Sequence, residues 1–136
     1  MKPIITLLLL LSSLTAQAEL VVVTGSQSSL VSLSELEVRQ LFAGHLRQLH
    51  GLRLQPLDLP LGNHNRDQFY RQLMGRSPEQ MRAYRTRLLF AGQGLPPHEV
   101  SGPGELTTLV GASTEYIGYL QANELHGDLK VLYRLP

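Results

Sequence analysis

The chain has 136 residues and no cysteine, with 12 lysines and arginines against 11 aspartates and glutamates. The lack of cysteine excludes disulfides, thiolate zinc sites and thiol catalysis. The near-zero net charge argues against a general nucleic-acid binder, which normally carries a clear basic excess. The length suits one domain with one modest core.

The first 18 residues have the pattern of an export signal. Lys2 precedes an almost wholly apolar run at residues 4–14, and the segment ends in the A-x-A pattern of Ala16 and Ala18. We expect a signal peptide at 1–18 and the folded domain at 19–136. A membrane anchor is the alternative, but this run is shorter than the roughly 20 residues that span a bilayer. The sequence therefore predicts a periplasmic protein that does not span the membrane after cleavage.

The first part of the domain predicts a strand followed by a helix. The β-branched run at 19–24 indicates a buried strand that ends at Gly25. Ser34 and Glu37 have the spacing of a capping box at a helix start, and Gly44 marks the end of that helix. The expected inward face consists of the apolar residues of this helix: Leu36, Leu41 and Phe42, with Val38 beside them.

The middle of the chain predicts a second strand and two helices. Leucines alternate imperfectly over 51–59, and Pro56 places this strand near a sheet edge. A helix is expected at 65–74, stopped by Gly75, and a second at 78–91, capped by Ser77. Their expected core residues are Phe69, Leu73 and Met74 in the first helix, and Met81, Tyr84 and Leu88 in the second.

The last part predicts a loop at 92–104, a short helix at 105–110 and strands at 116–120 and 129–135. Alternating strands and helices indicate an α/β domain with a mainly parallel or mixed sheet.

The sequence contains no catalytic constellation. None of the five histidines belongs to an HExxH motif, no serine lies in a G-x-S-x-G elbow, and the carboxylates form no recognisable pair. We therefore expect neither an enzyme, nor a metal site, nor a cofactor.

Arginines gather in the middle of the chain. Residues 64–87 contain six arginines against two acidic residues, which gives this segment a charge of +4. Solvated helix faces explain most of them, and a basic patch that docks a partner is the functional alternative.

The start of the expected helix at residue 65 is the best candidate for a ligand site. Asn63, His64 and Asn65 can donate hydrogen bonds there, and Arg66 offers a planar guanidinium suited to phosphate or carboxylate. Plain capping by asparagine is the competing interpretation. Both remain open at this point.

Several short motifs resemble the phosphate-binding proteins of ABC transporters, in the type 2 periplasmic-binding-protein superfamily. They are the Leu-Ser…Leu-Phe-x-Gly helix, the glycine turn before Arg-x-x-Phe, and a late Ile-Gly-Tyr. The resemblance implies a single-lobe α/β fold with a mixed or parallel sheet flanked by helices. It also implies a periplasmic substrate-binding-like protein that binds phosphate or another small oxyanion for an ABC permease. The implied ligand-binding residues are Asn63, His64, Asn65 and Arg66, with Ser26, Ser28 and Ser29 as further contributors.

Two departures from that family leave an alternative open. Asn63, His64 and Asn65 stand where those receptors place Ser-Gly-Thr, and the expected 118-residue domain matches one lobe of two. The alternative function is an interaction or accessory module of the envelope that keeps the lobe fold without ligand binding.

Overall fold

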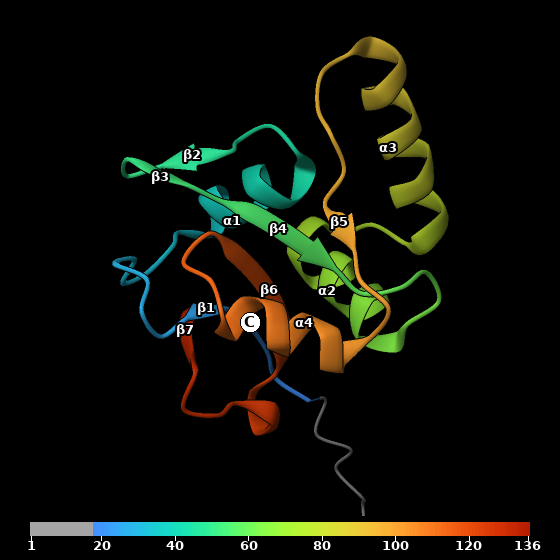
Figure 1. Ribbon diagram of the computed structural model, residues 1–136. Coiled ribbons are helices and arrows are strands. Elements are labelled where there is room, and N and C mark those ends of the chain that lie inside the picture. Colours follow the sequence, from blue (N-terminus) through green and yellow to red (C-terminus); the bar gives the residue numbers. More distant parts are fainter. Residues whose placement is uncertain (1–17) are drawn as a thin grey trace, which may run out of the picture.

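The computed structural model describes residues 18–136 (Figure 1). The expected signal peptide lies outside the described residues, apart from Ala18, and stays a prediction. No helix within residues 18–136 combines the length and the apolar character needed to cross a bilayer.

The core of the fold is a mixed sheet of five strands in the order β5-β4-β6-β1-β7. Its strands are β1 (Leu20–Gly25), β4 (Gln55–Asp58), β5 (His98–Glu99), β6 (Tyr116–Gln121) and β7 (Leu129–Arg134). β4 runs parallel to both β5 and β6, whereas β1 runs antiparallel to β6 and β7. The expected α/β class with a mixed sheet is thus confirmed.

Four helices flank the sheet: α1 (Glu35–Ala43), α2 (His64–Met74), α3 (Pro78–Ala91) and α4 (Pro103–Gly111). A short 3₁₀ turn, η1 (Ala122–Glu124), follows β6. The capping boxes of Ser34 with Glu37 and of Ser77 with Gln80 both form, as predicted. In Figure 1, α4 lies in front of the sheet, α1 and α2 lie behind it, and α3 projects away from the body of the molecule.

Alternation along β6 explains how the sheet is covered on both faces. Gly118 faces α4, because a Cβ at this position would lie 2.9 Å from Leu106 Cδ2. The next side chain, Tyr119, points to the other face and stacks on Phe69 of α2 at 3.9 Å between ring centroids. Phe42 of α1 packs edge-on against the same tyrosine. Neighbouring strand residues therefore serve opposite halves of the core.

Some expected details of the elements are wrong. Leu36 is 62% exposed, whereas Val38 is fully buried with Leu41 and Phe42. A helix face repeats every three or four residues, so position 38 aligns with 41 and 42 and position 36 does not.

The expected strand at 51–59 is divided in the structure. Its first part, β3 (Leu52–Arg53), forms a separate hairpin with β2 (Gln48–Leu49), which the sequence analysis missed. Its second part, β4, lies next to the two-residue edge strand β5, which pairs with Leu57 and Asp58 and not with Pro56. The expected position of Pro56 near an edge is confirmed. The expected loop at 92–104 contains β5, and α4 begins two residues earlier than expected.

Candidate functional site

The N-terminus of α2 lies beyond the C-terminal end of β4, where α/β sheets commonly bind ligands. Asn63 is the N-cap residue, and its Oδ1 accepts hydrogen bonds from the backbone N–H groups of Asn65 (2.9 Å) and Arg66 (3.2 Å). These are the amides that an oxyanion at a helix N-terminus would use. The asparagine side chain occupies them instead.

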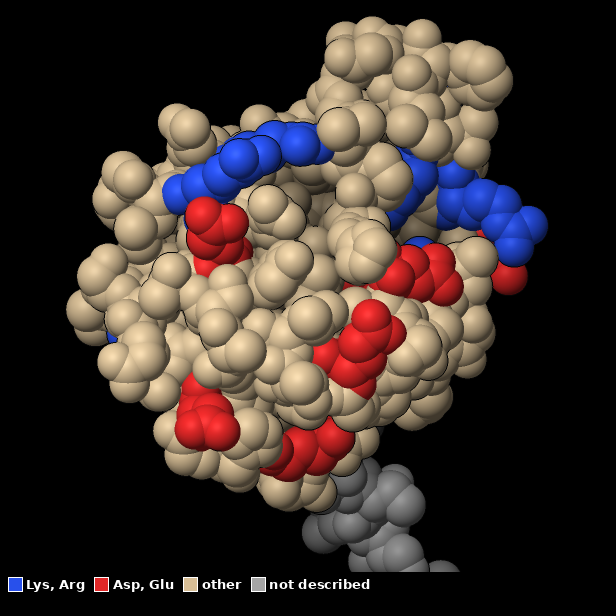
Figure 2. All heavy atoms as spheres, in the orientation of Figure 1, with Lys and Arg blue, Asp and Glu red and all other residues tan. Residues whose placement is uncertain are grey.

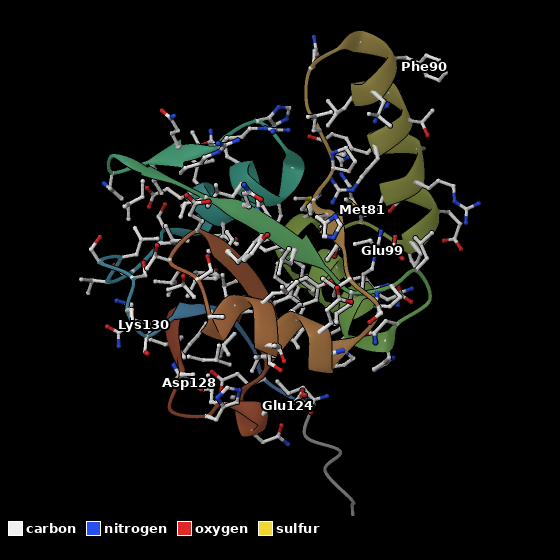
Figure 3. All side chains as sticks on the ribbon, in the orientation of Figure 1. Met81, Phe90, Glu99, Glu124, Asp128 and Lys130 are labelled. Carbon is white, nitrogen blue, oxygen red and sulfur yellow. The ribbon has the colours of Figure 1, made fainter. Side chains whose placement is uncertain are left out.

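Two amides just before the helix, those of Leu61 and Asn63, are also bonded within the chain. The Leu61 N–H donates to Glu99 Oε1 at 3.1 Å (Glu99 is labelled in Figure 3), and the Asn63 N–H donates to Pro60 O at 3.0 Å. The side chain of Asn65 accepts a hydrogen bond from Gln121 Nε2 at 3.0 Å. His64 is exposed.

Arg66 points into the protein rather than towards a ligand. Its side chain is 14% exposed, and Nη1 donates to the backbone oxygen of Leu59 at 2.7 Å. Its guanidinium also lies 3.8 Å from Asp58 Oδ2 and 3.7 Å from Glu99 Oε2. Two carboxylates therefore already balance its charge.

Asp58 is the centre of a buried polar network, hereafter the Asp58 cluster. The carboxylate is 2% exposed and accepts hydrogen bonds from the hydroxyls of Tyr70 (2.7 Å) and Tyr119 (2.5 Å). Arg85 Nη2 lies 3.7 Å from Asp58 Oδ2 and donates to the Tyr70 hydroxyl at 2.7 Å. With Arg66, these groups join β4, β6, α2 and α3.

Burial controls the protonation of the Asp58 cluster. Burial raises the pKa of the Asp58 carboxyl, while the charge of Arg66 and the tyrosine hydrogen bonds act in the opposite direction. Burial and the neighbouring Asp58 carboxylate raise the pKa of Tyr70 and of Tyr119 well above 10. Both tyrosines therefore stay protonated and act as donors.

The sequence patterns did not predict the Asp58 cluster. The interpretation of most arginines as solvated agrees with the exposure of Arg82 and Arg87, but Arg85 is largely buried, with 12% of its side chain exposed. Tyr119 lies 61 residues from Asp58 along the chain. No local sequence pattern connects such distant residues.

The structure does not bring the expected serines to the α2 N-terminus. β1 runs antiparallel to β6, so the loop after Gly25 lies near the start of β6, whereas Gln121 at its end contacts Asn65. The six residues of β6 separate the two ends, a span of roughly 16 Å at about 3.3 Å per residue.

The serines instead support their own loop. Ser28 is buried, and its Oγ accepts a hydrogen bond from the Leu30 N–H at 3.2 Å. Its backbone oxygen accepts a hydrogen bond from Lys130 Nζ. Ser26 and Ser29 lie exposed in the same loop. The seven expected ligand-binding residues thus fall into two groups at opposite ends of the sheet.

Within residues 18–136, no three histidine, aspartate or glutamate side chains converge in a way that would hold a metal ion.

Comparison with solved structures identifies the fold. A protein from Clostridium perfringens, assigned as a phosphate ABC transporter substrate-binding protein and solved with bound phosphate, matches with a TM-score of 0.67 and 13% identity. An ABC-type phosphate transport receptor from Vibrio cholerae matches with a TM-score of 0.66 and 12% identity. No protein-family model matches the chain, and no curated protein matches it significantly.

Both matches cover 85% of this chain but only 44% and 45% of the other proteins. The expected resemblance and single-lobe architecture are therefore confirmed at the level of the fold. Both solved proteins are described as components of phosphate transport. The chain has the α/β fold of slightly less than half of a phosphate ABC transporter substrate-binding protein.

Proposed function

We propose that this chain is an interaction module of the periplasm, in which the α2 N-terminus stabilises the fold and does not grip an anion. The observation that carries the proposal is the occupation of the Asn65 and Arg66 amides by the side chain of Asn63. Glu99 takes the Leu61 amide in the same way. The periplasmic location rests on the expected signal peptide.

Electrostatics support the same proposal. An incoming oxyanion would displace the Asn63 cap, which stabilises a helix by about 1 kcal/mol. It would also approach the carboxylate of Glu99, which is half-exposed beside Arg66. Because Arg66 already contacts two carboxylates, it has little positive potential left to offer.

Calorimetry on the protein purified from the periplasm tests the proposal with phosphate, sulfate and small carboxylates at millimolar concentration. We expect no saturable heat from the wild type. The double variant Asn63→Gly with Glu99→Gln frees the amides of Asn65 and Arg66 and removes the repelling charge, and it serves as the gain-of-binding control. Glycine is suitable because it costs only a few tenths of a kcal/mol as an N-cap relative to asparagine. Saturable heat in the wild type that disappears in Arg66→Ala would overturn the proposal.

The second candidate is a receptor for phosphate or another oxyanion that works with an ABC permease. Two amides favour it: in the described part of the chain, Gly62 and His64 have no partner for their backbone N–H groups. The fold likeness to a protein with bound phosphate supports the same candidate. The calorimetric experiment separates the two, since only this candidate predicts saturable heat in the wild type.

A further inference from the structure

We propose that a groove between the C-terminal ends of α1 and α2 docks an acidic, extended peptide segment of a partner protein. This inference rests on the proposed interaction function and names its surface and the chemistry of its partner. The groove lies at the opposite end of α2 from the expected anion site, so the two sites are tested independently.

The groove has a volume of about 550 Å³ and draws its walls from three helices and the turns that follow α1 and α2. This size falls within the range of about 300–1,000 Å³ typical of ligand sites. No aspartate or glutamate lines it, and its polar lining residues are Arg39, Gln40, His45, Arg71, Gln72, Arg76 and Tyr84.

Two of the arginines have no counter-charge. Within residues 18–136, the structure gives neither Arg71 nor Arg76 an ion pair with a carboxylate. Arg39 is engaged, because it pairs with Glu35 and donates from Nε to Leu73 O at 2.8 Å.

The helix ends do not cancel this positive charge. Each helix C-terminus contributes roughly −0.5 of a charge, so the ends of α1 and α2 together contribute about −1. The groove has three arginines, and Glu35 neutralises one of them, Arg39, so a net charge of two positive units remains on these side chains. A surplus of about one positive charge remains.

One of the free arginines is held in place. The guanidinium of Arg76 lies 3.8 Å from the centre of the Tyr84 ring, and the hydroxyl of Tyr84 lies 2.9 Å from His45 Nε2. Stacking fixes the plane of the guanidinium and leaves its edge to form paired hydrogen bonds with a carboxylate. The order already present reduces the entropy lost on binding.

Gln72 favours a peptide over a simple oxyanion. Its Oε1 is buried and has no hydrogen-bond partner among the described residues, although the side chain lines the groove. Rotation of the Gln72 side-chain amide towards the groove would let Oε1 accept a hydrogen bond from a bound molecule. A peptide supplies both carboxylates for the arginines and backbone N–H groups for Gln72, whereas sulfate supplies no donor.

The face of the molecule in front of the sheet carries both signs of charge. Figure 2 shows arginine and lysine atoms on the upper half of this face, near the base of α3 and the β2–β3 hairpin. Acidic side chains lie across its middle and lower parts.

A random decapeptide library displayed on phage tests the inference against the full chain purified from the periplasm. The peptide bound most tightly is then synthesised with a fluorescent label and titrated against three proteins. They are the wild type, Arg71→Ala with Arg76→Ala, and Arg82→Ala with Arg87→Ala. The last variant removes the same charge from exposed positions of α3 that do not line the groove.

We expect enrichment of acidic peptides and a loss of affinity of about tenfold in the groove variant, as for two charge-assisted contacts at a partly exposed site. We also expect the α3 variant to bind the peptide with nearly the wild-type affinity. Gln72→Leu should lower the affinity for the peptide, while its thermal unfolding shows an intact fold. Millimolar inorganic phosphate should not displace the peptide.

Three results would overturn the inference: no enriched acidic peptide, equal losses in both double variants, or complete displacement by phosphate. Equal losses of affinity in both double variants would be compatible with the interaction function but would show that the peptide does not bind specifically in the groove. Saturable anion heat at the α2 N-terminus would instead refute the proposed function and leave the groove result unchanged.

Discussion

Replacing Asp58 with alanine removes the common acceptor of the Asp58 cluster. Tyr70 and Tyr119 lose the acceptor of their hydroxyl hydrogens, and Arg66 and Arg85 lose their buried counter-charge. Removing one partner of a buried charge pair typically costs about 3–5 kcal/mol. A domain of this size has a total stability of roughly 5–15 kcal/mol. We therefore expect Asp58→Ala to lose a large fraction of the free energy of unfolding.

Urea unfolding followed by circular dichroism measures this loss. At a slope of about 2 kcal/mol per molar urea, the midpoint should fall by about 2 M. Asp58→Asn keeps one acceptor oxygen and should lose less, about 1–3 kcal/mol, because one tyrosine keeps its acceptor. Asp128→Ala is the matched control, since this carboxylate is exposed (Figure 3) and should change stability by less than about 0.5 kcal/mol. Equal midpoints for Asp58→Ala and the control would refute the reasoning.

We also expect the difference in stability between the wild type and Asp58→Asn to depend on pH. Because burial raises the pKa of Asp58 in the folded state above 3.8, folding favours the protonated carboxyl. The stability from this protonation is fully present below pH 3.8 and is lost as the pH rises through the raised pKa. The cost of Asp58→Asn should therefore be larger at acid pH than at neutral pH, and the opposite slope would show that Asp58 is stabilised as a carboxylate.

Three further substitutions test other parts of the account. Arg66→Ala should lower stability by about 2–4 kcal/mol, because the buried Asp58 carboxylate and the Leu59 oxygen lose a partner; a stable variant in urea would contradict the inward role of this arginine. Ser77→Ala should cost about 1 kcal/mol, since the capping box of α3 loses its acceptor, and thermal unfolding would detect it. Gly25→Ala should cost about 1–3 kcal/mol, because its Cβ would lie 2.7 Å from the backbone oxygen of Val110; an unchanged melting temperature would exclude that close contact.

Local signals in the sequence predicted the helices well. The capping boxes at Ser34 and Ser77 and the stop at Gly75 depend on residues within one helical turn, so a short window of sequence contains all the information. Strand β1 was equally clear, because a run of β-branched residues bounded by glycine has few alternatives. The mixed sheet followed from the alternation of these elements.

The chemistry at the α2 N-terminus depended on contacts across the fold. Asn63 and Arg66 have the same appearance in sequence whether they bind an anion or cap and brace the helix. The difference comes from Glu99, 38 residues beyond Leu61, and from Asp58, which is buried by strands and helices distant in sequence. Periodicity could place Tyr119 in a strand, but it could not show that its hydroxyl meets Asp58.

The central claim is that the amides at the start of α2 belong to the fold and not to a ligand. A phosphate titration of the ¹⁵N-labelled protein, followed by two-dimensional NMR, observes the Asn65 and Arg66 amides directly. The account predicts that both resonances keep their positions up to 10 mM phosphate, a concentration at which even a ligand with a millimolar Kd, about −4 kcal/mol, would be largely bound. Saturable shifts of these two amides, absent in Arg66→Ala, would contradict it.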